Sequence, residues 1–132
     1  MLSLPPTVRI WLSAQPVDLR KSFDGLAAMV REGLRGDPLS GDIFVFRNKA
    51  ADRIKLLVWE EDGYAIWYKR LEAGTFQFPF AETGRKEIAA WELAVLLEGI
   101  DLSQGKRRKR YSLPAAKQEE AREKAGKETG AS

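Results

Sequence analysis

The sequence of 132 residues contains no cysteine and no histidine. The lack of cysteine excludes disulfide bonds and thiolate catalysis within this chain, and it fits a reducing compartment. The lack of histidine removes the most common general base and the most common metal ligand of proteins. Any catalysis would therefore depend on other side chains.

Long apolar runs are also missing. No run approaches the ~20 residues that cross a bilayer. The first residues, MLSLPPTVRI, have neither the basic start nor the apolar core of a signal peptide. We therefore expect a cytoplasmic protein without membrane contact, built as one domain with a tail.

The formal net charge of +3 is distributed unevenly. Residues 1–101 carry 13 Lys or Arg against 15 Asp or Glu, whereas residues 102–132 carry 9 against 4. We expect residues 1–101 to form the folded domain. Residues 102–132 have almost nothing apolar to bury, so we expect a basic tail that is disordered in isolation. Its block KRRKR at 106–110 favours contact with a polyanion.

The strongest structural signal is the stretch 52–71, where the residues before and after Asp62-Gly63 alternate as in β-strands. Gly63 is expected to supply the positive φ of a tight hairpin turn. Pairing across this turn predicts two faces, one with Leu57, Trp59, Ile66 and Tyr68 and the other with Ile54, Leu56, Val58, Ala65 and Trp67. Because both faces are apolar, other elements must cover at least one of them.

Further strands are predicted at 7–13, 43–46 and 75–78, and the second is apolar on both faces, which favours a central position. An apolar stripe predicts a helix over 18–34 with Asp18 as its cap, and a second helix is predicted over 86–99 after a loop at 83–85. Strands and helices do not alternate as in doubly wound folds. We therefore expect an α+β domain in which a small antiparallel sheet, built on the hairpin, packs with two helices.

Acidic residues give weak catalytic signals. Glu60, Glu61 and Asp62 are expected to form a solvated hairpin turn. Asp24 and Asp52 are expected to pair with nearby basic side chains; a further hypothesis makes them ligands in a metal-dependent nuclease. Because phosphate-binding glycine loops and a nucleophile elbow are both missing, we expect neither an enzyme nor a cofactor or metal.

Basic residues that lie beside aromatic strand residues give a better signal. Lys and Arg can neutralise phosphates, and aromatic rings can stack on bases, so this combination suits nucleic acid. In the alternative, the aromatic side chains form the core and the charges are an ordinary solvated rim. The candidate nucleic-acid contacts are Arg20, Lys21, Arg47, Lys49, Arg53, Lys55, Lys69 and Arg70, with Lys106, Arg107, Arg108, Lys109 and Arg110 from the tail.

Five segments follow one another along the chain: DLRKSFDGL (18–26), PLSGDIFVFRNK (38–49), DRIKLLVWEEDG (52–63), KRLEAGTFQFP (69–79) and LAVLLEGID (93–101). In this order they resemble the signature blocks of the TnpB accessory proteins of insertion sequence 66 type, the Orf2-like family. The resemblance covers about residues 4–101, and departs where many members carry Trp-Asp instead of Trp59-Glu60 and Phe-x-Trp-Pro instead of residues 76–79. Neither departure changes the expected fold.

The resemblance implies an accessory protein of a transposable element that acts beside a separate DDE-type transposase, and it carries over no catalytic residues. The first hypothesis is therefore a non-catalytic transposition factor that binds DNA, the transposase of its element, or both. The alternative is an interaction module that docks on the transposase through Trp59, Ile66 and Tyr68 without touching DNA. Self-association through that face, giving a homo-oligomer, is a variant of the alternative.

Overall fold

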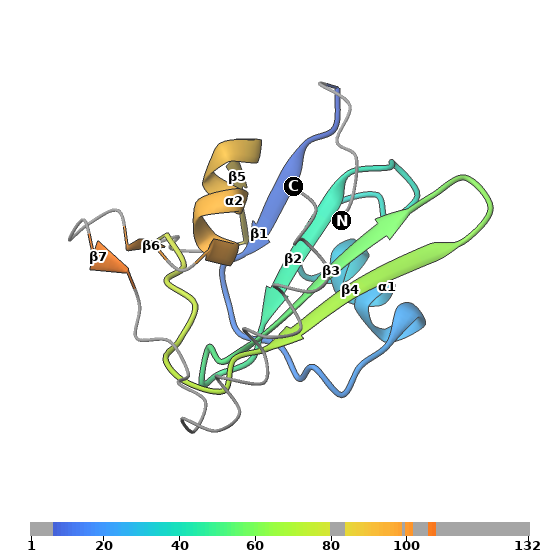
Figure 1. Cartoon of the computed structure of the whole chain (residues 1–132). Helices are drawn as coiled ribbons and strands as arrows, with labels where there is room; N and C mark the ends of the chain where they lie inside the picture. Colours follow the sequence, from blue (N-terminus) through green and yellow to red (C-terminus); the bar gives the residue numbers. More distant parts are fainter. Residues whose placement is uncertain (1–6, 80–83, 99, 102–105, 108–132) are drawn as a thin grey trace, which may run out of the picture.

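The computed structural model describes residues 7–79, 84–98, 100–101 and 106–107. Five strands form one sheet in the order β4-β3-β2-β1-β5, and β6 pairs with β7 (Figure 1). The prediction of an α+β fold with two helices is confirmed. In chain order the elements are β1 (Ile10–Ser13), α1 (Phe23–Glu32), β2 (Ile43–Arg47), β3 (Arg53–Trp59), β4 (Tyr64–Arg70), β5 (Arg85–Ile88), α2 (Ala90–Glu98), β6 (Ile100–Asp101) and β7 (Lys106–Arg107).

The sheet is mixed, which corrects the expectation of a wholly antiparallel sheet. β1 and β2 run parallel, whereas the other neighbouring strands of this sheet run antiparallel. A parallel pair needs a long crossover connection, and the segment that contains α1 supplies it. The central position of β2 is confirmed, because it lies between β1 and β3.

The hairpin of β3 and β4 has the predicted register, with Leu57 opposite Ile66 and therefore on the same face. The prediction for its turn is wrong in one respect. The positive φ of 68° falls on Glu61, and Gly63 does not adopt a left-handed conformation. The Glu60 N–H donates to the Gly63 carbonyl at 2.8 Å, which closes the turn without a special backbone at Gly63.

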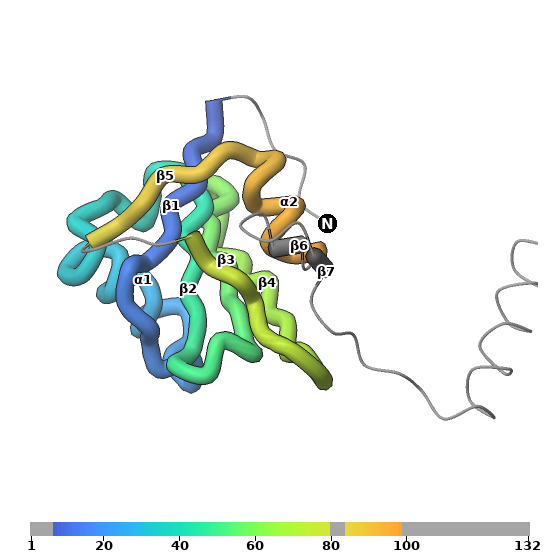
Figure 2. Tube along the Cα trace, turned by 90° about the vertical axis from the view of Figure 1, so that its left-hand side faces the viewer, coloured from blue at the N-terminus to red at the C-terminus, as the bar shows by residue number. Residues whose placement is uncertain are grey.

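The two helices cover opposite faces of the sheet (Figure 2). α1 packs Leu26, Ala27 and Val30 into one cluster with apolar side chains of β2 and β3. α2 packs Leu93 and Leu96 into a second cluster on the other face. Burial on both faces explains why the strands of the hairpin are apolar on both sides.

α1 is shorter than the predicted helix over 18–34, and Asp18 is not its cap. The carboxylate of Asp18 accepts the backbone N–H of Arg20 at 3.0 Å, so it stabilises a turn that precedes the helix. Ser22 is the residue before the first helical position. Leu19 is nevertheless buried in the α1 cluster, which accounts for its place in the apolar stripe of the sequence.

The strand predicted over 75–78 is wrong. Phe76 is buried, but its N–H donates to the Ala51 carbonyl at 2.7 Å and the segment joins no sheet. Instead, Arg85–Ile88 pairs with the remaining edge of β1, where a loop and the start of a helix were expected. α2 consequently begins at Ala90 rather than at residue 86. The tail beyond residue 107 lies outside the described residues, and so does its predicted disorder.

Candidate nucleic-acid interface

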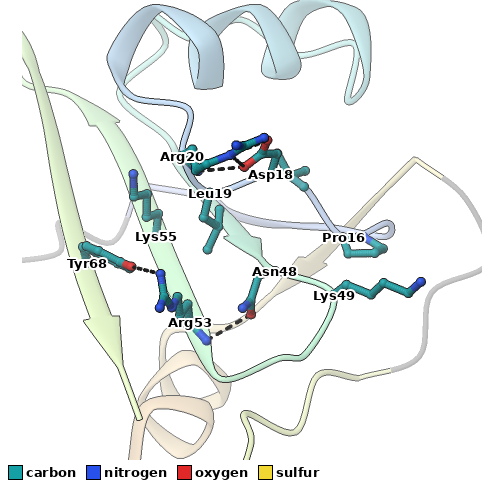
Figure 3. A pocket seen from close by; sticks show the side chains of 10 residues that line it. Pro16, Asp18, Leu19, Arg20, Asn48, Lys49, Arg53, Lys55 and Tyr68 are labelled. Carbon is teal, nitrogen blue, oxygen red and sulfur yellow. Dashed lines mark hydrogen bonds and ion pairs between the residues drawn. The ribbon is translucent and has the colours of Figure 1, made fainter. Parts of the chain in front are cut away.

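A hollow of about 670 Å³ lies between the segment that follows β1 and the hairpin of β3 and β4 (Figure 3). It brings together Arg20, Lys49, Arg53 and Lys55, which are four of the predicted nucleic-acid contacts from three separate parts of the chain. We call it the basic hollow. Its full lining is Pro16, Val17, Asp18, Leu19, Arg20, Asn48, Lys49, Arg53, Lys55 and Tyr68.

Backbone and side-chain hydrogen bonds hold the walls of the basic hollow in place. The Val17 N–H donates to the Arg47 carbonyl at 2.8 Å, which fixes the segment after β1 beside the end of β2. Asn48 accepts the Arg53 N–H at 3.1 Å and donates to the Asp52 carboxylate at 2.6 Å. The turn between β2 and β3 therefore has a defined shape. Asn48 was not among the site residues predicted from the sequence, because those were chosen for their positive charge.

Arg20 forms the upper wall with Asp18 in Figure 3. Its guanidinium lies 2.7 Å from the carboxylate, and its side chain is 91% exposed. Hydrogen bonds from the Arg20 side chain, and then from the Arg20 backbone N–H, lower the pKa of Asp18 to about 2. Asp18 is therefore ionised at neutral pH and neutralises part of the charge of Arg20.

Arg53 and Lys55 are directed toward neutral partners. The Lys55 ammonium donates to the Lys21 carbonyl at 2.9 Å and lies 5.0 Å from the centre of the Tyr68 ring. Arg53 donates from Nη1 to the Tyr68 hydroxyl at 3.3 Å. The lining has four cations and one carboxylate, which leaves a formal charge of +3. Such a concentration of unpaired positive charge favours an anionic ligand.

Two predicted contacts lie on the opposite face of the sheet. Arg47 and Lys69 are both in register with Ile54, which belongs to the cluster covered by α2. The Arg47 guanidinium also lies 5.4 Å from the centre of the Phe78 ring. These two cations do not join the basic hollow.

The remaining candidates differ in their surroundings. Arg70 lies on the same face as Arg53 but forms an ion pair with Glu72 at 2.9 Å. Lys21 contributes its carbonyl to Lys55, and its side chain lies against Gly25. Lys106–Arg107 forms β7, whereas Arg108, Lys109 and Arg110 lie outside the described residues.

Most aromatic residues of the sheet are part of its packing. This agrees with the alternative stated from the sequence, in which the aromatic side chains form the core. Phe46 is fully buried, and Trp67 packs against the cluster covered by α2. Trp59 makes an edge-to-face pair with Tyr64 at 5.0 Å between ring centres, near the hairpin turn. Of the aromatic residues that the structure describes, Tyr68 alone lines the basic hollow.

The acidic candidates for a nuclease do not converge. Within the described residues, neither Asp24 nor Asp52 forms an ion pair, contrary to expectation, and Asp52 instead accepts the amide of Asn48. In the same part of the chain, no three acidic side chains come close enough to hold a metal ion. No helix in the part of the chain that the structure describes has the length and apolar character to cross a membrane.

Comparison with known proteins places the chain in a family. The family described as IS66 Orf2 like protein matches residues 8–107. The chain belongs to the IS66 Orf2-like family. The resemblance that the five sequence segments carry is thereby confirmed, and the family associates the chain with an accessory role in transposition.

Two proteins of Sinorhizobium fredii strain NGR234 are similar to this Orf2-like chain. The protein y4jC is 40% identical over 101 residues, which are 76% of this chain and 86% of y4jC. The protein y4hO is 38% identical over 101 residues, which are 76% of this chain and 88% of y4hO. No solved structure matches the chain. The family match extends through residue 107 and therefore includes β7.

Proposed function

We propose that this Orf2-like chain is a non-catalytic accessory factor of transposition that binds the DNA of its element through the basic hollow. The observation that carries the proposal is the convergence of Arg20, Lys49, Arg53 and Lys55 around one concave site. Phosphate contacts of Lys and Arg supply most of the free energy of DNA binding that is independent of sequence. A cytoplasmic location, where such DNA is accessible, is part of the proposal.

The pairing of the cations supports this proposal. Within the described residues, Lys49, Arg53 and Lys55 form no ion pair, and the two ion pairs found there are Arg20–Asp18 and Arg70–Glu72. Arg53 and Lys55 are held by a hydroxyl and a carbonyl, which leave their positive charge uncompensated. A phosphate that enters the hollow meets charges already held in position, so binding loses little side-chain entropy.

The tail is expected to add affinity without sequence choice. Lys106, Arg107, Arg108, Lys109 and Arg110 stand next to each other in the sequence, and phosphate contacts carry no direct information about bases. Sequence preference for the ends of the element, if present, then comes from the folded domain.

Fluorescence anisotropy of the full chain with an element-end duplex and a scrambled duplex tests the proposal. If each of the four cations of the hollow neutralises one phosphate, the slope of log K against log salt is expected to be about −3.6 or steeper. Undetectable binding to both duplexes at low salt would contradict the proposal.

That negative result would favour the alternative in which the chain docks on its transposase without DNA contact. The surface first considered for docking is reduced, because Ile66 packs against the cluster of α1. The alternative would then be tested by co-purification of the full chain with the transposase of its element.

A further inference from the structure

Tyr68 is an aromatic residue that the fold leaves out of its core. The residue is 48% exposed, whereas Ile66 and Trp67, which precede it on β4, are better buried. The ring lies at the wall of the basic hollow, beside Arg53 and Lys55 (Figure 3). Exposure of a large ring is unfavourable in water, so a ligand that covers it would gain apolar contact.

Two cations fix the orientation of this ring. The Lys55 ammonium lies 5.0 Å from the ring centre, and Arg53 donates to the hydroxyl at 3.3 Å. Lys55 is itself tied to the Lys21 carbonyl at 2.9 Å. The ring is therefore held in place, with the Lys55 ammonium over one of its faces.

An exposed ring beside fixed cations suits one form of DNA better than the other. The bases of a duplex are stacked on each other, so their faces are not accessible to a side chain along the helix. An unpaired strand exposes the faces of its bases, and aromatic rings in positively charged grooves stack on them. Phosphates of the same strand can then contact neighbouring Lys and Arg side chains.

We infer that the basic hollow accepts an unpaired nucleotide of a DNA strand, with a base stacked on Tyr68 and phosphates at Arg53 and Lys55. The inference rests on the proposed function and names the form of DNA that the site takes. The hollow has a volume of about 670 Å³. That volume lies within the range of about 300–1,000 Å³ that is typical of sites for small ligands, and it suits one nucleotide.

The test compares a labelled single strand with the blunt duplex of the same length, by fluorescence anisotropy of the full chain at one salt concentration. The wild-type chain is expected to bind the single strand more tightly. Tyr68→Leu is expected to weaken single-strand binding by about 5- to 150-fold, the range measured for removal of a stacking ring, and duplex binding by less than about 2-fold.

Two further variants isolate the contribution of the ring. Tyr68→Phe keeps the ring and removes only the hydroxyl that accepts from Arg53, so single-strand binding is expected to fall much less than in Tyr68→Leu. Trp91→Leu changes an aromatic residue that is 61% exposed on α2, away from the hollow, and is expected to have no effect. Thermal unfolding followed by circular dichroism shows whether each variant folds.

The outcomes separate this inference from the proposed function. If the wild-type chain binds the duplex as tightly as the single strand, or more tightly, the inference is overturned without measurements on any variant. An equal loss of both kinds of binding in Tyr68→Leu also overturns it, because the ring then has no selective contact with bases. In both cases the proposed function stands, since DNA is still bound. Absence of binding to either DNA overturns both.

Discussion

Arg53 and Arg70 lie directly opposite each other on β3 and β4, so two like charges share one face of the hairpin. Arg70 is compensated by Glu72 at 2.9 Å, whereas Arg53 forms no ion pair within the described residues. Like charges in directly opposed positions destabilise a sheet. A local conflict of this kind is typical of a functional site, where charge serves a ligand rather than the fold.

The first prediction concerns the stability of Arg53→Gln. The change removes the repulsion from Arg70 and keeps a side-chain amide that can donate to the Tyr68 hydroxyl. We expect the free energy of unfolding to stay the same or to rise by up to about 0.5 kcal/mol, measured by urea denaturation. A loss of more than about 1 kcal/mol would show that Arg53 has a structural role that the packing does not indicate.

The second prediction concerns the hairpin turn. Glu61 has a φ of 68°, which is costly for a residue with a Cβ atom, so Glu61→Gly is expected to stabilise the protein by about 0.5–1 kcal/mol. Gly63 has no left-handed backbone, and a Cβ there would meet no atom within 4 Å. Gly63→Ala is therefore expected to be neutral or to stabilise by up to about 1 kcal/mol.

Thermal unfolding of the two variants measures both effects. A clear destabilisation by Gly63→Ala, together with no gain from Glu61→Gly, would mean that the turn uses the conformation expected from the sequence instead.

The parts of the fold with strong periodicity were predictable from the sequence. Alternation over residues 52–71 predicts the hairpin, its register and its two faces, all of which the structure has. Arg85–Ile88 was not predictable, because RKEI has one apolar residue and forms a strand only through its pairing with β1. The helix over 18–34 was predicted too long, because Leu19 fits the apolar stripe although Asp18 folds a turn there.

The candidate site was predictable in composition but not in assembly. Selection by positive charge identified the candidates Arg20, Lys49, Arg53 and Lys55. It also selected cations that lie elsewhere, so it did not show which residues come together. The segment with Arg20 lies near the hairpin because the Val17 N–H donates to the Arg47 carbonyl at the end of β2. No sequence pattern predicts a backbone contact of that kind. The separation of Lys69 from Lys55 follows from strand alternation, and could have been predicted from the register alone.

The third prediction concerns the pH dependence of the Asp18–Arg20 pair. Because the folded pKa of Asp18 is about 2 against an ordinary value of 3.8, the pair contributes stability that is fully present above about 3.8 and is lost as the pH falls through about 2. At neutral pH the contribution is constant. NMR titration of the Asp18 carboxyl carbon measures this pKa directly.

In Arg20→Gln, the pKa of Asp18 is expected to rise part of the way toward its ordinary value. The rise is partial, because the backbone N–H at position 20 still donates to the carboxylate. A pKa that does not change in this variant would contradict the hydrogen bonds from the Arg20 side chain as its main cause.

The fourth prediction concerns the tail. Replacing Arg108, Lys109 and Arg110 by Gln in the full chain removes three charges without shortening the protein. The slope of log K against log salt for duplex DNA is expected to become shallower by about 2.7, equally for element-end and scrambled sequences. An unchanged slope would exclude the tail from DNA contact, whereas a change limited to the element end would contradict its expected lack of sequence choice.

The most direct test of the account is the salt dependence of duplex binding by the double variant Arg53→Gln/Lys55→Gln, with Lys69→Gln as the matched control. Both variants lie on the hairpin, but Lys69 stands on the opposite face of the sheet from the basic hollow. We predict a slope shallower by about 1.8 for the double variant and a wild-type slope for the control. A wild-type slope in the double variant, in a protein that unfolds at the wild-type temperature, would contradict DNA binding through the basic hollow.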